Sequence, residues 1–249
     1  MSRQMSIRRK ILALGSPPVF FQASGRLQSM LAPLATAACL LALYAALWLA
    51  PGDAQQGEVY RVLYIHVPAA WMSMLLYVVA SAYAALHCIY RSTVSAVLLR
   101  ALLPTGAWMA ALALVTGALW GKPTWGTYWI WDARLTSELL LLFIYLGLIA
   151  IGSLVEDASK TDRLLAWFTL VGLVNIPLIY FSVVYWNTLH QGPSLGMAGP
   201  SRMAPEMKLI LLGCTLALWS ACIALVLARS RWLLLARESQ AQWVRKVLA

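Results

Sequence analysis

The sequence predicts an all-α integral membrane protein with six transmembrane helices and both termini in the cytoplasm. Of its 249 residues, 61% are hydrophobic and only 11% are charged, which is too little charge to cover the surface of a soluble domain. The apolar residues come in blocks of about 20, the length at which a helix crosses the hydrocarbon core of a bilayer. The basic residues are also distributed unevenly between the two sides that these blocks define.

Prolines and charged residues mark the ends of the six segments. The first segment is expected near 31–50, where Pro51 ends it, and the second follows Pro68, a residue favoured in a first helical turn, to about residue 89. Pro177 is expected to bend the fifth segment, because proline removes a helical hydrogen bond. The other segments are expected near 101–120, 136–155, 164–184 and 207–228.

The positive-inside rule gives the orientation. With the N-terminus inside, 14 of the 19 Lys and Arg residues fall on the cytoplasmic side. The chain then divides into a basic cytoplasmic tail (1–29), a membrane domain (30–228) and a basic C-terminal tail (229–249). The apolar residues of the C-terminal tail fit either an amphipathic helix on the membrane lipid or an exposed polar tail. The same rule explains the net charge of +10 without nucleic-acid binding.

The three outer loops, near 51–67, 121–135 and 185–206, are the longer ones, and function tends to lie in such loops. The middle loop is the richest in aromatic residues. Interfacial belts account for one or two aromatic residues at each helix end, whereas a row of indoles forms a platform for a large planar ligand. The density of aromatic residues alone does not decide between an interfacial belt and a ligand platform. The aromatic residues are Trp120, Trp125, Tyr128, Trp129 and Trp131.

Two of the three histidines favour the ligand platform. His66 lies at the outer start of the second segment, and His190 lies just beyond the outer end of the fifth. Two imidazoles at one membrane level match the axial ligands of a bis-histidine haem. His87 lies 21 residues after His66, about 31 Å along the same helix, so it cannot share an iron atom with His66 and is expected to be structural.

Asp132 and Arg134 end the aromatic loop. Arg134 matches a haem propionate as a bidentate partner, or alternatively pairs with Asp132 or Glu138. Asp132 is more suited to capping the fourth segment or holding the loop than to direct ligand contact. The four cysteines form no C-x-x-C pair, and the sequence has no phosphate-binding GxxxxGK[ST] motif, so ATP hydrolysis would require another subunit.

Three segments of the sequence resemble segments of one known protein family. WGTYWIWDARLT at 125–136 resembles the tryptophan-rich WWD signature of the haem-handling proteins of cytochrome c biogenesis, and YIHVPAAW at 64–71 and NTLHQG at 187–192 are similar to that family's histidine segments. Length and six spans fit the cytochrome c maturation protein C type, also called haem exporter protein C. Larger relatives that attach haem to the apocytochrome have more spans and extra histidines. Tyr128 stands where relatives often have tryptophan.

The resemblance implies a protein that holds haem b at the periplasmic side of the bacterial inner membrane. His66 and His190 would be its axial ligands, and the platform would consist of Trp120, Trp125, Trp129, Trp131 and Asp132. Such proteins promote the covalent loading of haem onto a periplasmic haem chaperone. The implied partners also include the ATP-binding and permease subunits of an ABC transporter and a small single-span subunit.

Two other functions compete with this interpretation. The chain could be the permease subunit of an ABC transporter that exports haem or another solute, but its inner loops are short and its unusual residues gather at one face. A b-type electron-transfer protein would place histidines inside the bilayer on facing helices, which this sequence does not. The sequence shows no nucleophile or acid–base pair, so haem transfer is favoured over enzymatic chemistry.

Overall fold

The computed structural model describes residues 15–186, 188 and 203–248, and every regular element in this part of the chain is a helix. Six helical stretches are long and apolar enough to cross a membrane, which confirms the predicted fold class. The elements are α2 (Pro17–Tyr44) with a π turn (Ala45–Leu49), a 3-10 turn (Glu58–Val62), α3 (Leu63–Tyr90), α4 (Thr93–Trp125), α5 (Ala133–Leu154), α6 (Ala158–Gly172), α7 (Asn175–Tyr185), α8 (Pro205–Arg237) and α9 (Gln242–Leu248).

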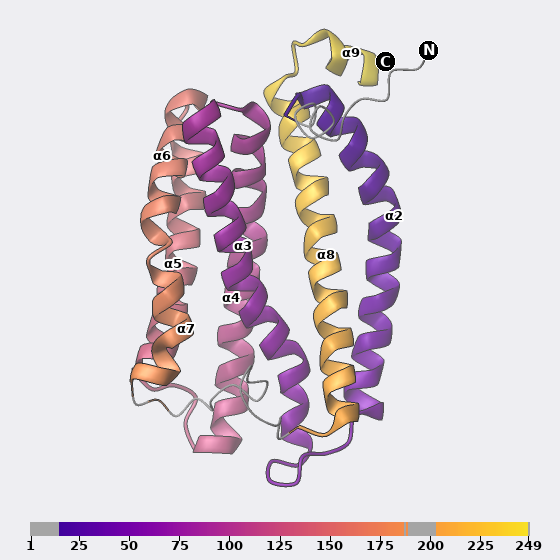
Figure 1. The fold of residues 1–249 in the computed structure, drawn as a ribbon, viewed down its shortest axis with the longest axis vertical. Coiled ribbons are helices and arrows are strands. Elements are labelled where there is room, and N and C mark those ends of the chain that lie inside the picture. The colour runs from indigo at the N-terminus through magenta and orange to yellow at the C-terminus, as the bar shows by residue number, and fades with distance from the viewer. Residues whose placement is uncertain (1–14, 187, 189–202, 249) are drawn as a thin grey trace.

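The helices form one elongated bundle (Figure 1). Helices α2 and α8 pack side by side, α3 packs closely on α4, and α5 to α7 complete the far side. The short helix α9 lies at the end of the bundle where α2 begins, and the loop between α4 and α5 lies at the opposite end. The chain therefore separates its basic C-terminal end from its aromatic loop by the full length of the spans.

Side-chain caps explain where helices α4 and α6 begin. Ser92 accepts a hydrogen bond from the Ser95 backbone N–H at the start of α4, and Asp157 does the same for Lys160 at the start of α6. Each cap satisfies a backbone donor that has no partner inside the helix. The hydrogen bond from the Lys160 N–H also holds the pKa of the Asp157 carboxyl below its usual value.

Several helices extend beyond the spans that hydropathy marks. Helix α2 begins at Pro17, not near residue 31, and α8 continues to Arg237. Helix α3 begins at Leu63, so Pro68 lies in its second turn and the expectation of a first-turn proline is wrong. Hydropathy reports the apolar part of a helix, whereas backbone hydrogen bonding continues into polar flanking residues.

Pro177 interrupts the fifth span, as the sequence predicts. Helix α6 ends at Gly172 and α7 begins at Asn175, so the chain turns at residues 173–174. Proline lacks the N–H that would bond to the carbonyl four residues earlier, here Leu173, and its ring crowds that carbonyl. The Asn175 side chain donates to the Ser137 carbonyl oxygen (2.9 Å) and ties the break to α5.

The C-terminal tail contains the helix α9, which packs back on the start of α2. The Trp243 ring lies 5.4 Å from the Phe21 ring between centroids, and Val244 is fully buried. Arg231 of α8 donates to the Phe21 carbonyl oxygen at the same place. These contacts join α9, α2 and α8 at one end of the bundle.

Two buried tyrosines join four helices in the centre. The Tyr145 hydroxyl of α5 donates to the Ser73 carbonyl oxygen of α3 (2.8 Å), and the Tyr77 hydroxyl of α3 donates to the Thr169 carbonyl oxygen of α6 (3.1 Å). Their rings meet edge to face at 5.2 Å. Tyr145 lies against Gly106 of α4, where an added Cβ would overlap the phenol ring. Small residues at such positions let membrane helices approach closely.

We expect Gly106→Ala to destabilise the bundle by about 1–3 kcal/mol, because the new methyl group displaces the Tyr145 ring from its packed position. Gly147→Ala is the matched control, since a Cβ at Gly147 meets no atom within 4 Å and alanine favours the helix. Thermal unfolding of the detergent-purified proteins, followed by circular dichroism, measures both. Equal unfolding midpoints for the two variants would contradict the packing role of Gly106.

Candidate functional site

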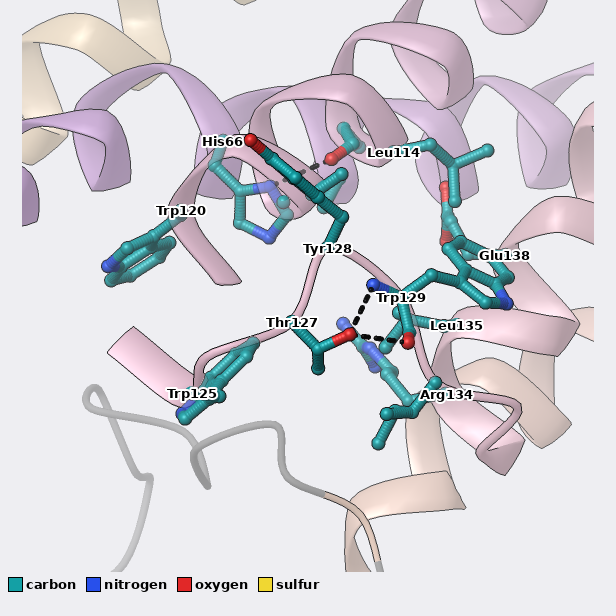
Figure 2. A pocket seen from close by; sticks show the side chains of 15 residues that line it. His66, Leu114, Trp120, Trp125, Thr127, Tyr128, Trp129, Arg134, Leu135 and Glu138 are labelled. Carbon is teal, nitrogen blue, oxygen red and sulfur yellow. Dashed lines mark hydrogen bonds between the residues drawn. The ribbon is translucent and has the colours of Figure 1, made fainter. Parts of the chain in front are cut away.

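A mostly apolar pocket lies at the end of the bundle opposite α9, between α3, α4, α5 and the loop that joins α4 to α5 (Figure 2). The space that the centre of a water molecule can occupy is about 50 Å³, within a hollow of about 700 Å³ that includes space open to the surroundings. Its side chains include one imidazole, four aromatic rings, one guanidinium and one carboxyl group. The polar and aromatic lining residues are His66, Trp120, Trp125, Thr127, Tyr128, Trp129, Arg134 and Glu138.

The His66 side chain is held by α4. Its Nδ1 lies 3.0 Å from the Ala113 carbonyl oxygen and 3.1 Å from the Thr116 hydroxyl oxygen. A carbonyl oxygen only accepts, so the bond to Ala113 requires that Nδ1 carries the proton. The neutral ring then has its lone pair on Nε2, the form in which histidine ligates a metal. In Figure 2 this edge of the ring faces the pocket.

Gly117 makes this position of the imidazole possible. A Cβ at Gly117 would lie 2.9 Å from the His66 Cε1 atom, closer than real Cβ contacts. The missing side chain lets the ring lie against α4, with the Trp120 ring edge-on at 5.7 Å. The orientation of the histidine is therefore fixed by backbone, a glycine and an aromatic neighbour.

The aromatic walls differ in how firmly they are held. Trp120 is only 8% exposed, and its indole N–H donates to the Gln56 side-chain oxygen (2.7 Å). Tyr60 meets the Trp120 ring edge to face at 5.8 Å. Tyr128 is 56% exposed, and the Lys122 ammonium lies 5.4 Å from the centre of its ring. One wall is thus part of the helical core, and the other belongs to the loop.

The loop turns so that Trp129 faces the pocket and Trp131 faces the surroundings. Gly126, at a φ of 80°, ends α4 in the left-handed conformation that glycine adopts most easily. The Thr127 hydroxyl donates to the Trp129 carbonyl oxygen (3.0 Å). Trp129 then lines the pocket, whereas Trp131 does not line it and is 77% exposed, although their rings touch edge to face at 5.4 Å.

Asp132 and Arg134 hold the loop to its surroundings. Asp132 caps α5 by accepting from the Leu135 N–H (2.8 Å), and its other oxygen accepts from the Thr188 hydroxyl. Arg134 lines the pocket and donates to the Ile179 carbonyl oxygen (2.8 Å). The described part of the chain contains no ion pair from Arg134 to Asp132 or Glu138, so those alternatives are not realised there.

Glu138 is a pocket residue whose role the sequence analysis missed. Its Oε1 accepts from the Ser73 hydroxyl (2.8 Å), and the residue is only 7% exposed. Its Oε2 and the Trp129 indole N–H have no hydrogen-bond partner among the described residues. Buried polar groups are normally satisfied, so these two groups are open to a hydrogen bond with water or with a ligand in the pocket. A lone acid in an apolar span was the available signal.

The remaining histidines lie elsewhere or outside the described residues. His190 falls among the residues that the structure does not describe, so its place relative to the pocket stays a prediction. His87 lies at the opposite end of α3, where its Nδ1 is 3.1 Å from the Ser92 carbonyl oxygen. It is buried and far from the pocket, in agreement with a structural role.

We expect Asp132→Ala to destabilise the protein by about 1 kcal/mol, because α5 loses its cap and Thr188 loses its acceptor. Asp132→Asn is the matched control, since asparagine caps helices as well as aspartate does. Thermal unfolding of both variants tests this. A large loss of stability in Asp132→Asn alone would show that the negative charge matters more than the cap.

Comparison with known proteins identifies relatives of this chain. The heme exporter protein C family model matches residues 10–245. The chain is 41% identical to heme exporter protein C of Bradyrhizobium diazoefficiens over 89% of this chain and 84% of the relative. It is 37% identical to heme exporter protein C of Escherichia coli K12 over 94% and 95% of the two chains. A putative cytochrome c biosynthesis ccmC-like mitochondrial protein of Marchantia polymorpha is 45% identical over 65% and 68%.

The match spans all six helical stretches, and the two bacterial relatives are covered over most of their length. A pocket that joins an oriented histidine to an aromatic loop is in keeping with haem handling in cytochrome c maturation. The chain belongs to the heme exporter protein C family, as a multi-pass membrane protein.

Proposed function

We propose that this protein binds haem b in the aromatic pocket at the periplasmic face of the bacterial inner membrane and delivers it to a periplasmic haem chaperone. His66 and His190 are the two axial ligands in this proposal. The observation that carries it is the imidazole of His66, which α4 orients so that its Nε2 lone pair faces the pocket. Haem iron is commonly held by such an axial imidazole.

The pocket lining suits a porphyrin. Trp120, Trp125, Tyr128 and Trp129 supply the aromatic surface, and burying apolar area contributes about 25 cal/mol per Å². The unpaired Trp129 N–H and Glu138 Oε2 add polar contacts at its margin. Arg134 uses one donor on Ile179, and a guanidinium carries five, so it keeps donors for a propionate.

The proposed topology places this pocket outside and the basic ends inside. The basic residues near the α3–α4 and α5–α6 connections, at the other end of the bundle, are Arg91, Arg100, Lys160 and Arg163. Their position fits the positive-inside rule when that end faces the cytoplasm. The proposed partners are the chaperone, the ATP-binding and permease subunits of an ABC transporter, and a small single-span subunit. Membership of the family supports partners within the cytochrome c maturation system.

The absorption spectrum tests axial ligation. We expect wild-type protein purified with added haem to show low-spin b-type bands that His66→Ala and His190→Ala change or abolish, because each removes one iron ligand. His87→Ala is the control and keeps the wild-type spectrum, since its ring lies at the far end of α3. A pyridine haemochrome assay measures the haem content and type.

A His66→Ala protein with an unchanged spectrum would contradict the proposed ligand set. Wild-type protein that stays free of haem at excess haem would leave the aromatic loop as an interfacial belt or docking surface. The second candidate function, a solute-exporting permease subunit, would then be favoured.

Trp129 and Trp131 separate haem binding from partner docking. We expect Trp129→Ser to lower haem content, because that ring lines the pocket. Trp131→Ser is expected to keep the haem spectrum but lower capture of the chaperone at least tenfold, since a tryptophan that becomes a hot spot of an interface contributes about 2 kcal/mol or more. Pull-down of the chaperone by haem-loaded protein measures this. Full capture by Trp131→Ser would show that docking does not use this side chain.

A further inference from the structure

A second cavity lies at the opposite end of the bundle from the aromatic pocket. It contains about 1160 Å³ of space between α4, α5, α6 and α8, part of it open to the surroundings. Three arginines line it, namely Arg100, Arg229 and Arg237, together with apolar side chains and Trp232. This cavity is named the arginine crevice below.

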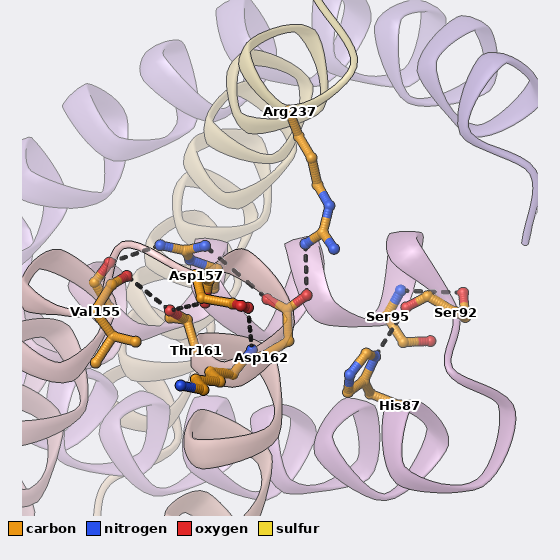
Figure 3. Close-up of polar contacts among 11 residues, drawn as sticks. His87, Ser92, Ser95, Val155, Asp157, Thr161, Asp162 and Arg237 are labelled. Atoms are coloured by element: carbon orange, nitrogen blue, oxygen red, sulfur yellow. Dashed lines mark hydrogen bonds and ion pairs between the residues drawn. The ribbon is translucent and has the colours of Figure 1, made fainter.

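The positive charge of the crevice is only partly balanced. Asp162 is almost completely buried and lies 2.7 Å from the Arg237 guanidinium and 4.0 Å from that of Arg100. Figure 3 shows Arg237 reaching down from α8 to this carboxylate. The single carboxylate of Asp162 is thus the ion-pair partner of two arginines. No carboxylate of the described residues lines the crevice itself.

Arg229 is the third cation, and no described residue pairs with it by an ion pair or hydrogen bond. Arg100 meanwhile donates to the Gly152 carbonyl oxygen (2.7 Å), which fixes its guanidinium at the end of α5. Arg229 is exposed to the surroundings, so an anionic group can reach its guanidinium and pair with it. The crevice therefore has room and charge for an anionic group.

The walls indicate that this anion carries an apolar chain. Gly152 lies in the last turn of α5, and Leu148, about 6 Å further along the same helix, lines the inner part. Pro104 lies four residues beyond Arg100 and continues the apolar wall. Trp232 lines the mouth and is largely exposed, as interfacial tryptophans are. The crevice thus runs from the membrane interface into the hydrocarbon layer.

We propose that the arginine crevice binds an acidic phospholipid of the surrounding bilayer. The headgroup phosphate lies among Arg229, Arg100 and Arg237, and an acyl chain follows the apolar wall between α4 and α5. Basic pockets between membrane helices recognise anionic headgroups in this way. The bound lipid would connect α8 to the other three helices, in addition to the Asp162 ion pairs. The proposal does not depend on haem binding.

The test uses haem-free protein in detergent with added lipid, followed by native mass spectrometry. Wild-type protein is expected to retain phosphatidylglycerol more tightly than phosphatidylcholine. Arg229→Gln is expected to lower phosphatidylglycerol affinity about fivefold, because one basic residue near the phosphate is lost. Arg163→Gln is the matched control. It removes an exposed arginine of α6 at the same end of the bundle but outside the crevice.

Asp162→Asn is expected to change phosphatidylglycerol affinity in the opposite direction from Arg229→Gln. It removes the carboxylate that competes for Arg100 and Arg237, so phosphatidylglycerol affinity is expected to rise. A loss caused only by misfolding would not produce this increase.

Three results would overturn the proposal. The first is equal phosphatidylglycerol affinity in wild type and Arg229→Gln. The second is equal affinity for phosphatidylcholine, which would mean an apolar groove without headgroup recognition. The third is displacement of the lipid by an equal concentration of glycerol 3-phosphate, which would mean a site for a small soluble anion.

Discussion

The close approach of α3 and α4 is the constraint on which the proposed site depends. No water reaches backbone groups in the hydrocarbon layer, so helices must satisfy their own polar atoms and place other polar groups against one another. Gly117 leaves space for the His66 ring, and the Ala113 carbonyl oxygen fixes its tautomer. Trp120, one turn further along α4, covers the ring. A side chain at Gly117 would displace the His66 ring, because its Cβ would lie 2.9 Å from the ring.

Two buried acids show how the bundle treats charge at its two ends. Asp162 has two arginine partners, and its contacts hold α6 to α8 and α4. Glu138 has a hydrogen bond to Ser73 on only one of its oxygens. An acid inside a membrane span is costly and usually functional. Glu138 lines the same pocket as His66, which favours a functional role there, whereas the ion pairs of Asp162 with two arginines favour a structural one.

Hydropathy and proline positions predicted the six spans and the break at Pro177, because both depend on local properties of the chain. The helix ends were predicted less well, since α2 and α8 continue beyond their apolar parts. Residue type alone singled out His66 and the aromatic loop. The contact between Ser73 and Glu138 joins residues that are 65 positions apart in the sequence. The turn at Thr127, which makes Trp129 and Trp131 face differently, has no periodic sequence pattern that would predict it. Such features arise only from the packed structure.

A protein that passes on its cargo has to hold it without retaining it. The pocket is divided accordingly: Trp120 is buried in the helical core, whereas Tyr128 lies on a loop and is largely exposed. Under the proposed function, the fixed wall keeps the iron ligand in place, and the loop wall supplies apolar contact that a docked partner can replace. Trp131 extends from that same loop toward the surroundings and touches Trp129. Under the same proposal, a partner that binds Trp131 would contact the loop that covers the cargo, and this contact would couple docking to release.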